Sequence, residues 1–286
     1  MSEIWQTLLV ALPLSTLLLW AALGEIYAER SGVVNLGVEG MMILGALFAF
    51  AVAQETERPG LGLLAGMGAG ALAASLHALV VVTLRANQYV SGLALTMFGL
   101  GLSAMLGRRW EGLPLLNTLP ETSPVSYGVF LLALVLWFVL YQTRWGIAIR
   151  SAGEAPAAAD ALGVNVYLVR YLCVVFGGAL AGVAGAYLSL AYRPSWTEGM
   201  TVGLGWIAVA IAIFAAWDPL KGVGGALLFG VLFHLAFRLQ ERIAPEALQM
   251  MPFISAILVL ALTSPRRGRV QAAPEALGLP YVRGEK

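Results

Sequence analysis

The chain is dominated by apolar runs long enough to cross a lipid bilayer. About nine runs approach the roughly 20 apolar residues that a transmembrane helix needs. They cover residues 4–23, 33–53, 61–84, 89–106, 127–141, 167–190, 202–217, 222–239 and 249–263. Charged residues make up only 12% of the chain, about half their share in a soluble domain. The sequence therefore predicts an all-α, polytopic helical membrane protein whose transmembrane domain occupies residues 1–264.

Composition and spacing exclude several other classes. A formal net charge of +1 gives nucleic-acid binding no electrostatic support. The single cysteine, Cys173, can form neither an internal disulfide nor a cysteine-based metal site. His77 and His234 have no neighbour at metal-ligand spacing, so we expect both to be packing residues. We therefore predict no metal site and no catalytic residue.

The chain also lacks a nucleotide-binding loop of the form G-x-x-x-x-G-K-[ST], which needs a lysine directly after glycine. Its two lysines, Lys221 and Lys286, follow a leucine and a glutamate. We expect no cofactor on this chain, and ATP and Mg²⁺ would have to bind another polypeptide.

Polar residues and glycines concentrate in residues 24–42, at the junction of two apolar runs. The glycines that permit a departure from helical geometry are Gly32, Gly37 and Gly40. Unwound backbone at membrane depth is tolerated where it lines a cavity or is buried in protein. We therefore predict an interrupted helix near the N-terminus.

Asn35 and Glu39 lie between these glycines, and interrupted helices commonly mark the substrate path of a transporter. Ionisable groups inside a membrane are usually functional. We therefore predict that Asn35 and Glu39 line a substrate path. The alternative is an ordinary turn that ends before Val33 and leaves Glu39 in a packing seam between helices.

Trp206 and Trp217 lie near the two ends of the run 202–217. Tryptophan near a span end is typically an interfacial anchor. Stacking of Trp206 against a flat ligand in the path is the functional alternative.

The connection 143–166 predicts one short helix. Glu154 and Pro156 suit its first turn, the alanines suit its body, and Gly163 suits the position after its end. A helix of two turns is marginal alone in water, so either the rim of the bundle or a partner must hold it.

Basic residues set the orientation. If the connection 143–166 and the tail 265–286 both face the cytoplasm, most arginines and lysines lie inside, and the N-terminus lies outside. The tail is basic at first and then rich in alanine, proline and glycine, so we predict a solvated end with little fixed structure.

Small residues recur at four-residue spacing in two runs, at Gly62, Gly66 and Gly70 and again at Gly178 and Gly182. This spacing predicts close helix–helix seams.

Two groups of residues carry a family likeness. The first is Gly24-Glu25, Glu29-Arg30-Ser31-Gly32, Asn35-Leu36-Gly37 and Glu39-Gly40-Met41, and the second is Gly146, Arg150, Gly153-Glu154, Pro156, Ala159-Asp160, Gly163-Val164 and Arg170. Together they resemble the permease subunits of bacterial ABC importers for nucleosides, relatives of the ribose and branched-chain amino-acid permeases. Ala155 and Leu204 depart from the pattern, where the family usually has asparagine and arginine.

The resemblance implies a multi-pass subunit of the bacterial cytoplasmic membrane that moves nucleosides. Its partners would be a homologous permease subunit, a cytoplasmic ABC ATPase and an extracytoplasmic substrate-binding lipoprotein. The ATPase would be coupled through Arg150, Gly153, Glu154, Pro156, Asp160 and Gly163. From the residues themselves, and not from the resemblance, we assign Asn35, Glu39 and Trp206 to the substrate path.

Three alternatives remain open at the level of sequence. The first is a branched-chain amino-acid or sugar permease of the same superfamily. The second is a proton-coupled secondary carrier, which would need a relay such as Glu39 with His77 or His234. The third is a membrane enzyme, for which the sequence offers no paired acid and base.

Overall fold

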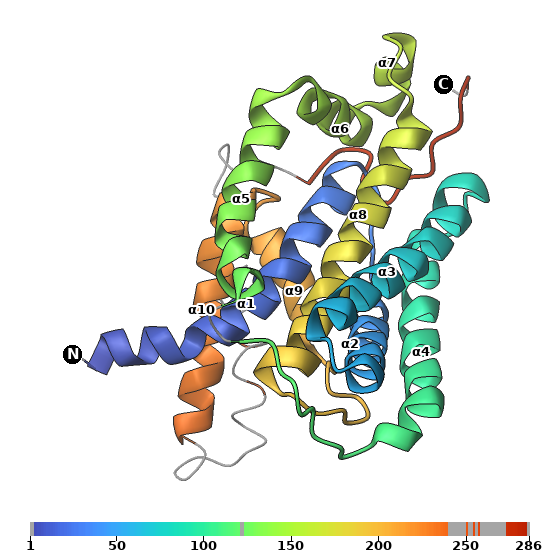
Figure 1. Cartoon of the computed structure of the whole chain (residues 1–286). Coiled ribbons are helices and arrows are strands. Elements are labelled where there is room, and N and C mark those ends of the chain that lie inside the picture. Colours follow the sequence, from blue (N-terminus) through green and yellow to red (C-terminus); the bar gives the residue numbers. More distant parts are fainter. Residues whose placement is uncertain are drawn as a thin grey trace.

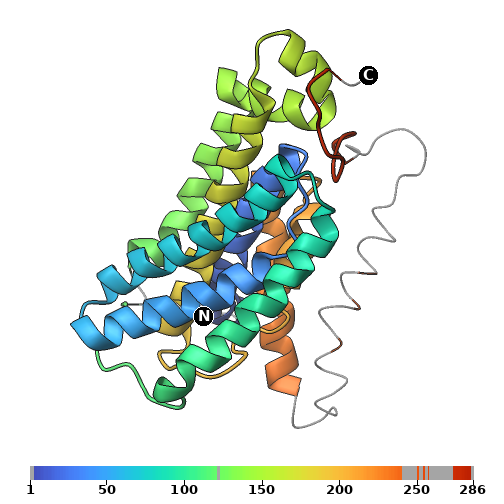
Figure 2. The same cartoon turned by 90° about the vertical axis from the view of Figure 1, so that its right-hand side faces the viewer.

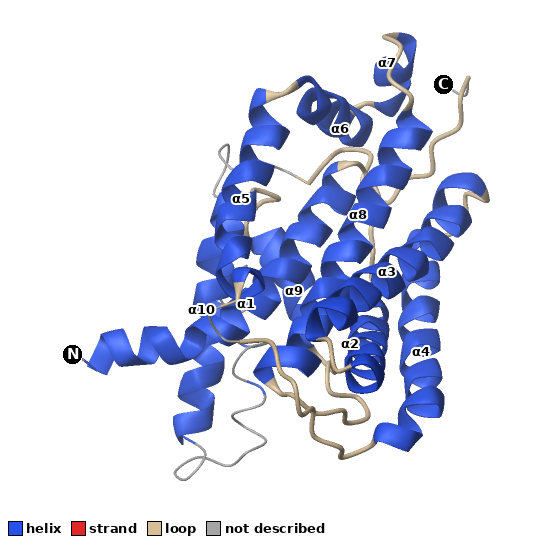
Figure 3. Cartoon of the chain, viewed as in Figure 1, coloured by secondary structure: helices blue, strands red, loops and turns tan. Residues whose placement is uncertain are grey.

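The computed structural model describes residues 3–120, 123–239, 250, 254, 257 and 273–284. Over these residues the chain is a bundle of helices without strands (Figure 3). The helices are α1 (Glu3–Arg30), α2 (Val38–Thr56), α3 (Pro59–Ala78), α4 (Gln88–Gly107), α5 (Pro124–Gln142), α6 (Arg144–Glu154), α7 (Pro156–Ala161), α8 (Val166–Tyr187), α9 (Leu204–Phe214) and α10 (Pro219–Leu239). Helices α3 and α8 continue in π-helical turns at Leu79–Thr83 and Leu188–Tyr192. The predicted all-α class is confirmed.

Seven of the described helical stretches are long and apolar enough to span a membrane. They are Leu9–Arg30, Val38–Thr56, Pro59–Thr83, Gln88–Trp110, Pro124–Gln142, Val166–Tyr192 and Pro219–Ala236. A polytopic membrane protein is thus confirmed, but the predicted count of nine spans is too high for the described residues. The run 202–217 forms only the 11-residue helix α9, and most of the run 249–263 lies outside the described residues.

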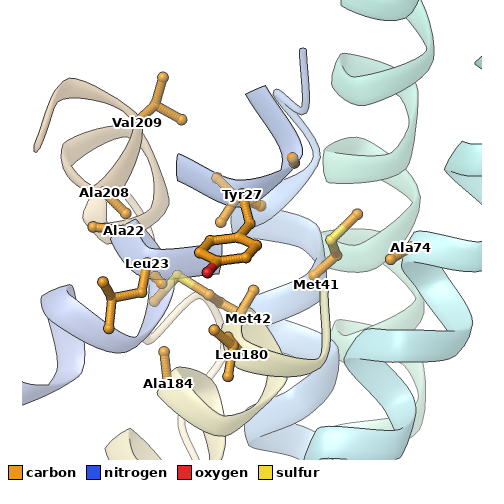
Figure 4. Close-up of a cluster of buried hydrophobic side chains, with 14 of the residues drawn as sticks. Ala22, Leu23, Tyr27, Met41, Met42, Ala74, Leu180, Ala184, Ala208 and Val209 are labelled. Atoms are coloured by element: carbon orange, nitrogen blue, oxygen red, sulfur yellow. The ribbon is translucent and has the colours of Figure 1, made fainter. Parts of the chain in front are cut away.

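Helices α1, α2, α8 and α9 meet in the middle of the bundle (Figure 1). Their apolar side chains gather around the ring of Tyr27, whose hydroxyl donates to the Leu136 carbonyl of α5 at 2.6 Å (Figure 4). Because lipid offers no hydrophobic drive between helices, such contacts stabilise the bundle by close packing.

Glycines bring α3 against α2 and α8. A Cβ atom added at Gly66 would lie 2.7 Å from the carbonyl oxygen of Gly45 in α2, and one at Gly70 would lie 2.2 Å from that of Gly178 in α8. Any larger side chain would force these helices apart. The close seams predicted from the glycine spacing are confirmed.

The far end of the tail is packed, which corrects the prediction of a tail with little fixed structure. Residues 273–284 cross the side of the bundle that carries α6 and α7, as the red segment in Figure 2 shows. The side chains of Ala276 and Tyr281 are buried there. The basic first part of the tail, with Arg266, Arg267 and Arg269, lies outside the described residues.

Candidate functional site

The chain leaves helical geometry inside the bundle between α1 and α2. Helix α1 ends at Arg30, α2 begins at Val38, and Gly32 between them has a φ of +93°. A side chain at Gly32 would be strained by this φ and would meet the Arg170 guanidinium at 2.8 Å. The predicted interruption is confirmed, and a turn that ends before Val33 is ruled out because the backbone stays non-helical through Gly37.

Side chains of neighbouring helices form hydrogen bonds with the backbone amide and carbonyl groups of this segment. The amide of Val34 donates to Gln88 Oε1 at 2.7 Å, and its carbonyl lies 3.1 Å from His77 Nε2. The carbonyl of Leu36 accepts from the Thr96 hydroxyl at 2.9 Å. Since His77 Nδ1 also lies 2.9 Å from the Ser91 hydroxyl, both of its ring nitrogens are engaged. The predicted packing role of His77 is confirmed.

Asn35 is held by the buried carboxylate of Glu25, one turn before the end of α1. Its amide side chain donates to Glu25 Oε2 at 3.2 Å, and its backbone amide donates to Glu25 Oε1 at 3.3 Å. Asn35 Oδ1 accepts from the Gly37 amide at 3.1 Å, just before α2 begins. Asn35 therefore fixes the shape of the segment, and it is 1% exposed in the isolated chain.

Glu39 lies in the first turn of α2 and binds the amino end of α9. Its Oε2 atom accepts from the amides of Gly203 at 3.1 Å and Gly205 at 2.9 Å. These amides are among the groups that a helix leaves unpaired at its start, where a negative charge is stabilising. A Cβ at Gly205 would lie 2.6 Å from the Cα of Glu39, so only glycine permits this approach.

The carboxyl end of α9 is held by the end of α1. Ala216 and Trp217 both have left-handed backbones, with φ of +50° and +56°. Arg30 donates to their carbonyls, from Nη2 to Ala216 at 3.1 Å and from Nε to Trp217 at 3.0 Å, and the Trp217 indole donates to Glu29. Two strained residues in succession persist only when their surroundings fix them, and Arg30 and Glu29 do so.

Residues 24–42 therefore hold both ends of α9, with Glu39 at the amino end and Arg30 and Glu29 at the carboxyl end. The places of the Glu39 carboxylate and the Arg30 guanidinium match the helix dipole. Trp206, next to Gly205, points to the surface with Ile213, two turns later on the same face, and the two side chains are 38% and 39% exposed. The structure thus brings Glu39 and Trp206 to the amino end of α9, whereas Asn35 lies apart from them with Glu25. Gly40 packs in the first turn of α2 against the Leu95 carbonyl of α4.

The connection 143–166 contains two helices, not the single one predicted. Glu154 ends α6 and does not lie in the first turn of α7, which begins at Pro156. Gly163 does follow the end of α7 with a φ of +88°, as predicted. Arg150 of α6 lies over the Tyr141 ring, with its guanidinium carbon 5.3 Å from the ring centroid.

The end of α6 contacts the interrupted segment directly. A Cβ at Gly153 would lie 2.2 Å from the Arg30 carbonyl oxygen and 3.2 Å from the Gly32 amide. On α7, Asp160 accepts from Arg283 through both carboxylate oxygens, at 2.6 and 2.8 Å. The Arg283 guanidinium holds the pKa of Asp160 below its usual range, so the pair is charged at neutral pH.

Sequence reasoning missed the second half of the site. Glu25, Glu29 and Arg30 stood in the motif, but nothing in the sequence assigned them partners. The left-handed Ala216 and Trp217 carry no glycine signal. Asp218 follows these two residues, and its side chain accepts from the Leu220 amide at 2.9 Å at the start of α10.

The family described as the permease component of the branched-chain amino acid transport system matches residues 7–262. The putative glucose ABC transporter permease protein TsgC13 of Haloferax volcanii is 38% identical over 94% of this chain and 95% of its own length. The guanosine ABC transporter permease protein NupQ of Bacillus subtilis is 36% identical over 98% of this chain and 96% of its own.

A third relative is the nucleoside ABC transporter permease protein NupC of Lactococcus lactis, 33% identical over 95% of each chain. No solved structure matches significantly. The resemblance to ABC permeases that the two motifs indicated is therefore confirmed.

Proposed function

Because the chain belongs to the family of branched-chain amino acid transport system permease components, we propose that it is the membrane subunit of an ATP-driven importer of nucleosides. The observation that carries the choice of substrate is that two relatives aligned with nearly the whole chain are named as guanosine and nucleoside permeases. The two sequence motifs point to the same subfamily.

The substrate path runs along the outward face of α9. Trp206 and Ile213 are exposed on that face although α9 lies among the central helices. A nucleoside is neutral and carries a flat base, so an aromatic face beside amide and backbone donors suits it. Glu39 lies directly behind this face, and its release from Gly203 and Gly205 would present both a carboxylate and two backbone donors to the path.

The chain works in a complex. A homologous permease subunit covers the outward face of α9, and a cytoplasmic ATPase binds ATP and Mg²⁺, because this chain has no phosphate loop. The ATPase docks on α6 and α7 through the residues from Arg150 to Gly163. An extracytoplasmic lipoprotein delivers the substrate. This places the N-terminus outside and residues 273–284 in the cytoplasm, consistent with their position beside α6 and α7.

A sugar is the second candidate substrate, because one relative aligned with nearly the whole chain is named a putative glucose permease. A proton-coupled carrier is disfavoured, because relatives aligned with nearly the whole chain are named as ABC transporter permeases.

Uptake by the reconstituted complex tests the proposal. The chain, its companion permease and the ATPase are placed in proteoliposomes, and the substrate-binding lipoprotein is added on the side from which substrate is taken up. Uptake of radiolabelled guanosine, glucose and leucine is measured with and without ATP on the side of the ATPase. We expect ATP-dependent uptake of guanosine that unlabelled uridine or adenosine reduces and glucose does not. Uptake of glucose alone would establish the sugar alternative, and uptake driven by a pH gradient without ATP would overturn the ATP-driven reading.

A further inference from the structure

Residues 274–283, here called the strap, run along the side of the bundle that carries α6 and α7 (Figures 1 and 2). Two turns shape the strap, with the Leu277 amide donating to Pro274 at 2.9 Å and the Leu279 amide donating to Ala276 at 3.2 Å. Buried Ala276 and Tyr281 anchor it. It is a docked part of the fold.

The first half of the strap joins α6 to the interrupted segment. The Ala276 amide donates to the Gly153 carbonyl at 2.9 Å, and the Gly278 amide donates to the Gly32 carbonyl at 3.2 Å. The Glu275 amide donates to the Glu154 side chain at 3.2 Å. A single short stretch of backbone is therefore bonded both to the end of α6 and to the start of the non-helical segment.

Arg170 of α8 binds the strap, α6 and the non-helical segment at the same time. Its guanidinium donates to the carbonyls of Ser31 at 3.2 Å, Leu279 at 3.0 Å and Ala152 at 3.5 Å. The side chain is 2% exposed, so these bonds replace its solvation. A shift of the strap at Leu279 would therefore move the Arg170 guanidinium, which also binds the Ser31 and Ala152 carbonyls.

The second half of the strap holds α7. Arg283 forms the two-pronged ion pair with Asp160, and the Tyr281 ring packs on that of Tyr167, with centroids 5.4 Å apart. Helix α7 has only six residues, of which Ala159 alone is buried, so it needs such support from outside.

We propose that the strap transmits movement of α7 to the interrupted segment, with Arg283 and Gly278 as positioning residues for coupling. The proposal rests on the proposed function, in which the ATPase docks on α6 and α7. Displacement of α7 pulls Arg283, the strap carries the pull to the Gly32 carbonyl, and the segment that fixes both ends of α9 is displaced. Among the described residues, the strap therefore adds to the direct contact that Gly153 of α6 makes with Arg30 and Gly32.

The test is the number of substrate molecules imported per ATP hydrolysed by the full complex in proteoliposomes. For Arg283→Glu, which repels Asp160, we expect this ratio to fall about fivefold or more while ATP hydrolysis and assembly persist. Arg283→Lys keeps the charge and should restore most of the ratio. Arg109→Glu is the matched control, because Arg109 also forms an exposed ion pair, with Glu55, but away from the strap.

An unchanged ratio for Arg283→Glu in an assembled complex overturns the proposal. Loss of ATPase binding in this variant also overturns it, since the strap would then serve docking and not transmission. If wild type moves glucose and no nucleoside, the proposed substrate fails, and the same ratio measured with glucose still tests the strap.

A second measurement needs no substrate. Hydrogen exchange of the chain in detergent is compared with that of a variant that ends at residue 273. Loss of the strap should speed exchange of the amides in residues 31–37 about tenfold, because their anchor at Gly32 is gone. Unchanged exchange there would show that the strap does not bear on the segment.

Discussion

The two ends of α9 are held by the same stretch of sequence but in different ways. At the amino end one carboxylate, Glu39, accepts from two backbone amides. At the carboxyl end Arg30 and Glu29 act together on two strained residues. The amino end is released when the Glu39 carboxylate alone leaves its two amides. Release of the carboxyl end requires the hydrogen bonds of both Arg30 and Glu29 to break. We therefore expect α9 to pivot about its carboxyl end when the path opens, with Trp206 on the moving end.

Replacing Arg30 should produce the largest loss of stability. Arg30→Ala removes the donors to the Ala216 and Trp217 carbonyls and leaves two left-handed residues unsupported. The free energy of unfolding should fall by about 3 kcal/mol, measured by thermal unfolding in detergent. Arg109→Ala, which breaks an exposed ion pair, serves as control and should change it by less than about 0.5 kcal/mol. Equal effects of the two variants would mean that the carboxyl end of α9 is not locked.

Crowding the amino end should cost less, because α9 can shift there. In Gly205→Ala the new Cβ meets the Glu39 Cα at 2.6 Å, and we expect a loss of about 2 kcal/mol. Gly224→Ala in α10 is the matched control, because a Cβ there has no neighbour within 4 Å. A Gly205→Ala variant as stable as its control would show that α2 and α9 do not need this close approach.

Neutralising Glu39 distinguishes its structural role at the start of α9 from a role in transport. Glu39→Gln keeps an acceptor for the Gly203 and Gly205 amides and loses only the charge at the helix start, so stability should fall by about 1 kcal/mol. Uptake affinity or rate should nevertheless change, since the carboxylate lies directly behind the proposed path and would be presented to it on release from the two amides. Lowered stability with unchanged uptake kinetics would instead place Glu39 in a packing seam and remove it from the path.

Trp206 should have the smallest effect on stability. Its side chain is 38% exposed, so Trp206→Ala in the isolated chain should change the free energy of unfolding by less than about 0.5 kcal/mol. In the complex the same change should weaken guanosine uptake, with Trp206→Phe restoring part of it through the retained aromatic face. If uptake by Trp206→Ala matches wild type, the outward face of α9 does not contact substrate.

Local chemistry made part of this architecture predictable. Gly32 and the polar residues after it interrupt the helix because glycine permits the backbone and the polar groups need partners. Gly66 and Gly70 form the seam because nothing larger fits. Gly163 ends α7 because its φ favours glycine. In each case the cause lies within a few residues of the effect.

The rest depends on partners that are distant in sequence. Helix α9 ends early because the residues after it, Ala216 and Trp217, adopt left-handed backbones whose carbonyls accept from Arg30. Arg30 lies 187 residues before Trp217 in the sequence. The strap looks disordered by composition, yet its amides find the Gly153 and Gly32 carbonyls, which the fold alone places side by side. No local sequence pattern predicts hydrogen bonds between residues so far apart in the sequence.

The glycine seam has a consequence for how the chain is made. Gly70 of α3 is synthesised long before Gly178 of α8, although each leaves room for the backbone of the other. Insertion into the bilayer and packing between helices are separate events, so α3 can enter the membrane with its glycine face uncovered. Until α8 arrives, that face is open to any helix with small residues, and a slow ribosome lengthens this interval. Mispairing during biogenesis is therefore a hazard at α3 in particular, before the finished chain has moved any substrate.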